Sequence, residues 1–175
     1  MLSNVVVDAI NRQINCELAG SYTYLAMSAW CSLQQFHGCA HWLRMQSQEE
    51  SGHAMKLLDF LLARNGEVKL EAIVAPERTF KSLPEVFELA LKQEQEVTAQ
   101  IDKLYELAFK EKQFAALVEL QWFIAEQVEE EKTAREIVAK FELVKNDPAS
   151  LLDLDRDLGG RTTAAAASSA APKGD

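Results

Sequence analysis

The chain has 175 residues, of which 27 are acidic and 18 basic, giving a formal net charge of −9. This charge argues against a nucleic-acid-binding protein, which needs a basic face to meet phosphates, and it suits cations, metal ions included, as partners. Hydrophobic residues make up 48% of the chain, which is enough for one globular domain. The 7 glycines and 4 prolines are too few for the many turns of an all-β protein.

No segment predicts a membrane span or a leader peptide. The longest uncharged run, residues 18–35, contains several hydroxyl and amide side chains and predicts a buried amphipathic helix. The amino terminus has neither the cationic region nor the cleavage site of a signal peptide. Three cysteines, an odd and sparse set, favour a reducing compartment, so a cytoplasmic location is expected. The spacing of Cys31, His37, Cys39 and His41 suits no standard zinc motif.

The first half of the chain predicts two long helices. Apolar residues at three-to-four spacing indicate one helix over residues 4–35 and a second over residues 39–65. Gly38 is expected to mark the break between them. Gly66 is expected to end the second helix in a left-handed conformation after Asn65.

Residues 67–81 differ from the helices because apolar and charged residues alternate there at first. This pattern predicts an extended crossover that could span a bundle end to end, since an extended residue covers about 3.3 Å against about 1.5 Å in a helix. Ser82 and Glu85 then form a capping-box pattern, with Pro84 tolerated in the first turn. A third helix is therefore predicted over residues 82–110.

A fourth helix is predicted over residues 114–145. Asp147 and Pro148 are N-cap and first-turn signals for a short fifth helix over residues 148–158, which two glycines end. Residues 161–175 are rich in alanine, serine and threonine without an amphipathic pattern, so a flexible tail is expected there.

These elements predict an all-α fold, a four-helix bundle with a long crossover loop between its second and third (B and C) helices and a short fifth helix. The bundle domain is expected to cover residues 1–160. One long crossover is the connectivity of ferritin-like bundles. An up-down-up-down bundle, the alternative, would not need the long connection.

Several polar residues lie where the apolar stripes of the helices should pass. Glu17 follows Ile14 by three residues at the edge of the uncharged run. Glu50 and His53 form an i, i+3 pair on one face of the second helix. Buried unpaired carboxylates are costly, so a metal cluster that neutralises them would explain their placement.

The second half of the chain repeats this arrangement. Glu94 lies on the third helix, and Gln127 and Glu130 form an i, i+3 pair on the fourth. The separation of 33 residues between Glu17 and Glu50 recurs between Glu94 and Gln127. Di-iron carboxylate bundles use one Glu from each of two helices and a Glu-x-x-His pair from each of the other two. Here the second pair reads Gln-x-x-Glu instead. Carboxylates with one imidazole suit iron, manganese or zinc.

Over residues 1–160 the sequence resembles the prokaryotic non-haem ferritins. The resemblance rests on the constellation above, in register with the helices and the long loop. It implies that Glu17, Glu50 and His53 hold one iron ion. It also implies that Glu50, as a bridge, holds the other iron with Glu94 and Glu130.

The resemblance implies further residues around this centre. Gln127 is expected beside it, and Tyr24 matches the family tyrosine nearby, where it could donate an electron or be a plain core aromatic. Trp122 matches a neighbouring aromatic residue. No haem is expected, because Ser51 stands where bacterioferritins have the methionine that ligates haem, and Glu130 stands where they have a histidine.

A third iron site is also implied by the resemblance. Glu49, Glu126 and Glu129 stand at the positions of the acids that flank the centre, and Glu130 would be shared. The alternative is a charged outer face, since residues 126–131 are strongly acidic and some of these acids must be solvated.

The activity that the resemblance implies is ferroxidase chemistry, in which Fe²⁺ is oxidised with O₂. The product Fe³⁺ would be stored as a ferric oxide mineral inside a cage of 24 copies of the chain. The alternative is a di-iron oxidoreductase without storage, such as a rubrerythrin-like peroxidase, but the sequence lacks the Cys-x-x-Cys pair usual there. A structural subunit without activity would be expected to lack Glu17 or His53.

Overall fold

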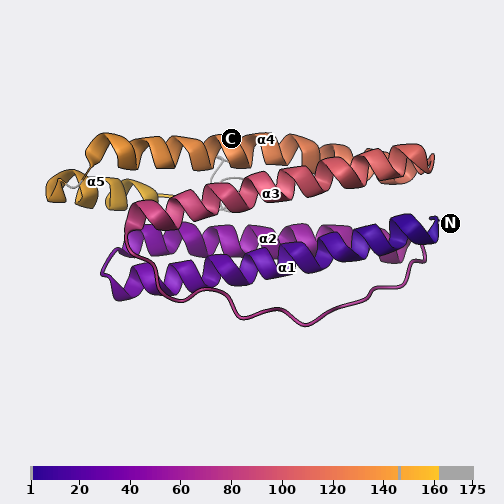
Figure 1. The fold of residues 1–175 in the computed structure, drawn as a ribbon, viewed down its shortest axis with the longest axis horizontal. Coiled ribbons are helices and arrows are strands. Elements are labelled where there is room, and N and C mark those ends of the chain that lie inside the picture. The colour runs from indigo at the N-terminus through magenta and orange to yellow at the C-terminus, as the bar shows by residue number, and fades with distance from the viewer. Residues whose placement is uncertain (1, 146, 162–175) are drawn as a thin grey trace, which may run out of the picture.

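The computed structural model describes residues 2–145 and 147–161. Within these ranges the chain forms five helices and no strand. Helices α1 (Asn4–Leu33) and α2 (His37–Ala63) form one antiparallel pair, and α3 (Leu83–Lys110) and α4 (Phe114–Val144) form the other (Figure 1). The short helix α5 (Pro148–Gly159) packs mainly on α2. The predicted all-α bundle with a short fifth helix is confirmed.

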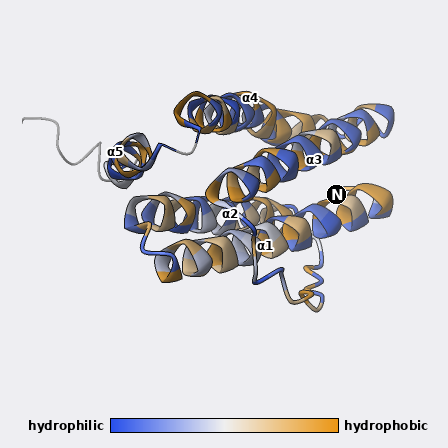
Figure 2. Cartoon of the chain, turned by 60° about the vertical axis from the view of Figure 1, so that its left-hand side comes forward, coloured by the Kyte–Doolittle hydropathy of each residue, from blue (hydrophilic) through white to orange (hydrophobic). Residues whose placement is uncertain are grey.

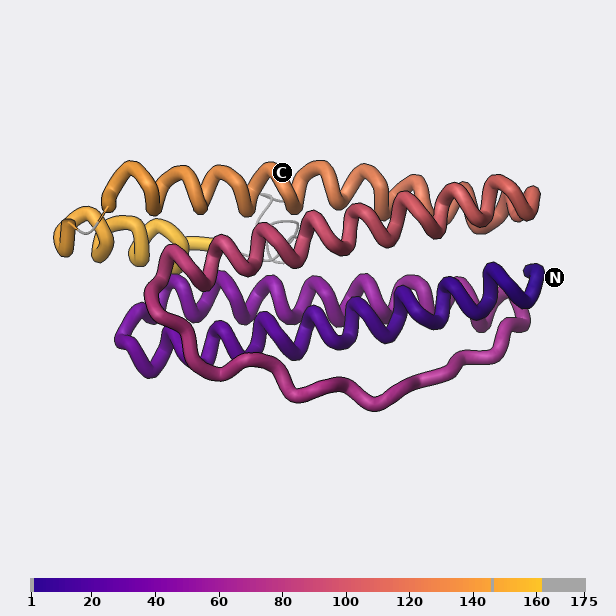
Figure 3. The backbone as a smooth tube through the Cα atoms, viewed as in Figure 1, coloured from indigo at the N-terminus to yellow at the C-terminus, as the bar shows by residue number. Residues whose placement is uncertain are grey.

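The segment between α2 and α3 is extended and returns along the outside of α1 from one end of the bundle to the other (Figure 3). Two asparagines on the outer face of α1 hold it. Asn11 accepts from the Lys69 backbone N–H at 2.6 Å and donates to the Glu67 carbonyl at 2.8 Å. Asn15 accepts from the Glu71 backbone N–H at 2.7 Å. This return path makes α3 parallel to α2, and it matches the predicted crossover that spans the bundle end to end.

The interior contains two separate clusters of buried apolar residues. One, around Ile14, Leu57 and Ile101, fills the end of the bundle near the amino terminus. The other, around Leu43 and Phe87, fills the opposite end. Each long helix contributes to both clusters, and hydrophilic and hydrophobic residues alternate around α3 in particular (Figure 2). The polar residues predicted as ligands lie on the helix turns between the two clusters.

Two glycine predictions were wrong in detail. Gly38 does not form the break between α1 and α2, because it lies in the first turn of α2. The left-handed residue of the turn between these helices is Gln35 (φ 68°). At the end of α2, Asn65 itself adopts the left-handed conformation (φ 57°) and Gly66 does not. An asparagine tolerates this conformation better than most residues, which explains why the glycine was not needed for it.

The two predicted amino-terminal caps are present. The Ser82 hydroxyl accepts from the Glu85 backbone N–H at 3.3 Å at the start of α3. The Asp147 carboxylate accepts from the Ser150 backbone N–H at 2.8 Å at the start of α5. The ends of all five helices lie within two residues of the predicted ends.

None of the described helices is long and apolar enough to cross a membrane. Of the predicted tail, residues 162–175 lie outside the described residues. Its first residue, Arg161, is described and contacts α2 rather than solvent alone.

Candidate metal centre

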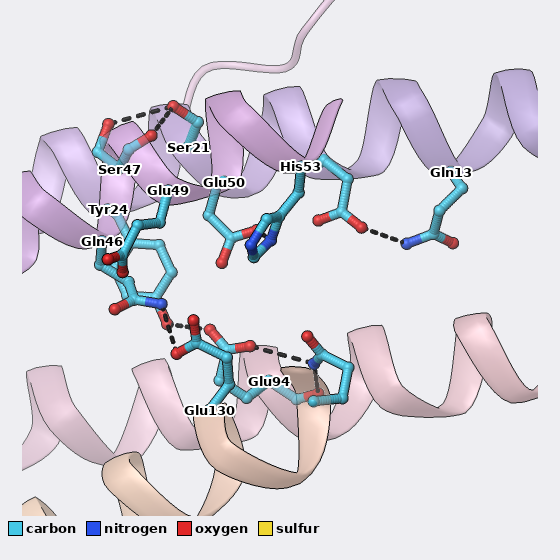
Figure 4. A network of polar contacts seen from close by, with 12 residues as sticks. Gln13, Ser21, Tyr24, Gln46, Ser47, Glu49, Glu50, His53, Glu94 and Glu130 are labelled. Atoms are coloured by element: carbon cyan, nitrogen blue, oxygen red, sulfur yellow. Dashed lines mark hydrogen bonds and ion pairs between the residues drawn. The ribbon is translucent and has the colours of Figure 1, made fainter. Parts of the chain in front are cut away.

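Six polar residues from the four long helices meet in the middle of the bundle, between the two apolar clusters (Figure 4). Each is 7% exposed or less, which is unusual for charged side chains. They are the residues that the sequence placed at the centre: Glu17, Glu50, His53, Glu94, Gln127 and Glu130.

On the α1–α2 side, ligand atoms of Glu17, Glu50 and His53 all lie within 4.8 Å of one another. The His53 Nδ1 atom is 3.6 Å from a Glu50 carboxylate oxygen. One oxygen of Glu17 accepts from the Gln13 amide at 2.9 Å. The other is buried without a hydrogen-bond partner among the described residues. An orphaned carboxylate oxygen beside an imidazole fits a cation ligand.

On the α3–α4 side, hydrogen bonds orient two further carboxylates. The Tyr24 hydroxyl donates to one oxygen of Glu94, and the Gln127 amide lies 3.3 Å from the other. Gln127 also donates to the Glu94 carbonyl at 3.2 Å. The Gln46 amide donates to Glu130 at 2.7 Å. Tyr24 is fully buried, and both Tyr24 and Gln127 hydrogen-bond to Glu94.

The electrostatics of the group favour bound cations. Burial, followed by the charge of Glu50, raises the pKa of Glu17 well above its usual value. Burial and then the Glu94 charge raise the pKa of Glu50 well above its usual value, and that of Glu130 to about 7. Burial also raises the pKa of Glu94, although Tyr24 and Gln127 oppose it. Four neighbouring buried acids resist ionisation unless positive charge is bound beside them, and two divalent cations would balance their charge.

Aromatic rings hold the imidazole in place. The His53 ring makes edge contacts with Trp122, at 5.4 Å between ring centroids, and with Phe123 at 6.0 Å. Trp122 is 39% exposed and carries the Lys56 ammonium 4.8 Å from its ring centroid. Trp122 therefore lies next to the centre, between His53 and the surface.

The three acids of the implied third site are not gathered into one group. Glu126 has a ligand atom within 4.8 Å of those of His53 and Glu130. Glu129 is exposed, and its carboxylate lies 3.4 Å from Lys132. Glu49 forms an ion pair with Arg161.

Sequence reasoning missed three residues that contact acids of the central group or of the implied third site, namely Gln13, Gln46 and Arg161. Gln13 and Gln46 each precede a central glutamate, Glu17 or Glu50, by four residues, so each lies one helical turn away on the same face. That spacing was a readable signal. Arg161 carried no signal, because it follows two glycines at the start of a segment without a pattern.

A family model described as a ferritin-like domain matches residues 7–144 of the chain. The chain belongs to the ferritin family. This membership, with the bundle and its long crossover, confirms the predicted ferritin-like fold.

Individual ferritins are similar over nearly the whole chain. A probable bacterial non-heme ferritin-like protein of Haemophilus influenzae is 39% identical over 165 residues, covering 94% of this chain and 100% of that protein. A bacterial non-heme ferritin of Staphylococcus aureus is 34% identical over 162 residues, covering 93% and 98%. An open pore ferritin from the archaeon Archaeoglobus fulgidus is 42% identical with a TM-score of 0.91, covering 93% and 99%. The resemblance to the prokaryotic non-haem ferritins is therefore confirmed.

Proposed function

We propose that this ferritin chain is an iron-storage subunit with ferroxidase activity. It oxidises Fe²⁺ with O₂ at a di-iron centre and stores Fe³⁺ as a ferric oxide mineral inside a homo-oligomeric cage. The observation that carries the proposal is the buried group of four carboxylates and one imidazole between two apolar clusters. Such a group is unfavourable in a bundle core unless cations occupy it.

The proposed ligands follow from the two sides of the group. One iron ion binds Glu17, Glu50 and His53. The mutual distances of their ligand atoms, all within 4.8 Å, support this assignment. The second binds Glu94 and Glu130, with Glu50 as the bridge. Glu50 is 1% exposed, and the neighbouring charges of Glu94 and Glu130 add to burial in raising its pKa, so it suits a ligand that two cations share.

The ligand chemistry favours oxidation. Carboxylate oxygens are hard, anionic donors, which bind Fe³⁺ more strongly than Fe²⁺ and so ease the loss of an electron. Two Fe²⁺ ions give one electron each to O₂, which takes up two protons from water and is reduced to hydrogen peroxide. Hydrogen bonds from Tyr24 and Gln127 hold the Glu94 carboxylate in one orientation while the charge on the metal changes. The contact between Tyr24 and a proposed ligand also supports this residue as an electron donor.

Three further properties belong to the proposal. A third iron ion binds beside the centre on Glu126 and Glu130, with Glu49 and Glu129 at its edge, which the closeness of Glu126 to His53 supports. The centre works without haem, as Ser51 stands at the position of the haem methionine. The cage has 24 subunits and lies in the cytoplasm, supported by family membership and by the three free cysteines.

Sedimentation after aerobic loading with excess Fe²⁺ tests the storage function. We expect the iron to travel with a large, dense particle that also contains the protein, because the mineral is enclosed. A protein that stays small and retains only a few iron ions per chain would contradict storage. In that case the rubrerythrin-like alternative would be assayed directly with hydrogen peroxide as the oxidant.

A further inference from the structure

Arg161, the residue that follows α5 and its terminal glycines, reaches back to the face of α2 that borders the metal centre. Its guanidinium pairs with the Glu49 carboxylate and donates to the Gln46 side-chain oxygen at 2.8 Å. The same group lies over the Trp42 ring, 4.6 Å from its centroid. The backbone carbonyl of Arg161 is 2.9 Å from the His41 Nε2 atom. Contacts of both the side chain and the backbone therefore hold Arg161 against α2.

The docking of α5 on α2 determines where Arg161 lies. The Asp155 carboxylate accepts from the Cys39 backbone N–H at 2.7 Å, at the otherwise open start of α2. Close by, the α-carbon of Gly38 lies 3.2 Å from a β-carbon built on Gly159, so the two helices touch backbone to backbone. This contact directs the chain after α5 along α2 toward Glu49.

Gln46 connects Arg161 to the centre. Its amide is fully buried, with the oxygen accepting from Arg161 and the nitrogen donating to Glu130 at 2.7 Å. A guanidinium can only donate, so Arg161 fixes which end of the amide faces Glu130. Arg161 is therefore a positioning residue for one proposed iron ligand.

Glu49 would also belong to the edge of the proposed third iron site, and there it already has a cation. The Arg161 side chain is 20% exposed and that of Glu49 31%, so water screens their attraction only in part. We propose that Arg161 is the resident counter-cation of Glu49 and competes with a third metal ion, so that the intact centre holds two metal ions tightly. A third ion uses Glu49 only after the guanidinium is displaced. This inference rests on the proposed function.

Anaerobic calorimetric titration with Fe²⁺, repeated with redox-inert Zn²⁺, measures the competition in the assembled protein. We expect the wild-type chain to bind two ions tightly and a third more weakly. In Arg161→Gln the third ion binds about tenfold more tightly, as expected for removing one partly screened competing charge. The matched control is Arg156→Gln, which removes one exposed positive charge of α5 and should bind like the wild type.

A second set of variants separates competition from a change in shape. In a Glu49→Gln background, Arg161→Gln should give no gain, because the shared carboxylate is absent. Arg161→Lys keeps the charge but cannot fork between Glu49 and Gln46, so its third ion should bind less tightly than in Arg161→Gln. If Arg161→Gln does not fold, Arg161→Lys takes its place in the comparison with the wild type.

Two results would overturn the inference. One is equal affinity for the third ion in wild type, Arg161→Gln and Arg161→Lys. The other is a gain that persists without Glu49. Absence of the two tight sites from the wild-type chain would instead remove the proposed function itself, and the two failures are distinguishable in the first titration.

Discussion

Replacing His53 with alanine, or Glu94 with glutamine, is expected to lower the initial rate of Fe²⁺ oxidation by at least about 100-fold, since losing a proposed direct ligand should exceed the effect of losing its outer partners. Each variant leaves one of the two proposed iron positions a ligand short, and transfer of electrons from two irons to one O₂ needs both. Stopped-flow recording of ferric absorbance after mixing with aerobic Fe²⁺ measures the rate.

The control for these variants is Glu96→Gln. Glu96 lies on α3 two residues from Glu94 but is exposed and pairs with Lys92 at 3.7 Å, so its variant should keep the wild-type rate. Assembly should be intact in all three variants, because none of these side chains lies in the two apolar clusters. Survival of the fast phase in both His53→Ala and Glu94→Gln would show that the assigned centre is wrong.

Gly38→Ala displaces α5 from α2. A β-carbon at this position would lie 1.6 Å from the Asp155 carbonyl oxygen, an overlap with backbone that no side-chain rotation relieves. We expect a loss of about 1–3 kcal/mol in the free energy of unfolding, as for other overpacked sites. Denaturant unfolding measures this loss, and hydrogen exchange should show faster exchange confined to α5 and the first turn of α2.

The matched control is Gly52→Ala, the same change on the same helix. A β-carbon at Gly52 would meet nothing within 4 Å. Removing a glycine from a helix interior should raise the free energy of unfolding by about 0.5–1 kcal/mol. The same substitution is therefore expected to lower the free energy of unfolding at Gly38 and to raise it at Gly52. A Gly38→Ala chain as stable as the wild type, with unchanged exchange in α5, would contradict the observed packing.

The helices and the six central residues could be predicted because both depend on local periodicity. Glu17, Glu50 and Glu94 are conspicuous when the surrounding stripe is apolar, and equal spacing in the two halves pairs them without knowledge of the fold. Gln46 was readable by the same rule, one turn before Glu50, although sequence reasoning did not use it.

Other features depend on contacts between distant segments, which a periodic pattern does not contain. Arg161 meets Glu49 across 112 residues, and only the docking of α5 brings them together. The role of Gly38 is likewise set by α5 and not by its own turn. The acids of the implied third site were assigned only by their match to family positions, which carries no information about burial or partners. In the structure these acids do not form one group, because Glu129 faces solvent and Glu49 pairs with Arg161.

The location of bound iron tests the central claim most directly. Anomalous scattering at the iron edge, from crystals soaked anaerobically in Fe²⁺, should give two strong peaks per chain inside the bundle. One should lie within coordination distance of Glu17, Glu50 and His53, and the other should be shared by Glu50 with Glu94 and Glu130. Iron peaks confined to the surface, with none within reach of His53, would contradict the account.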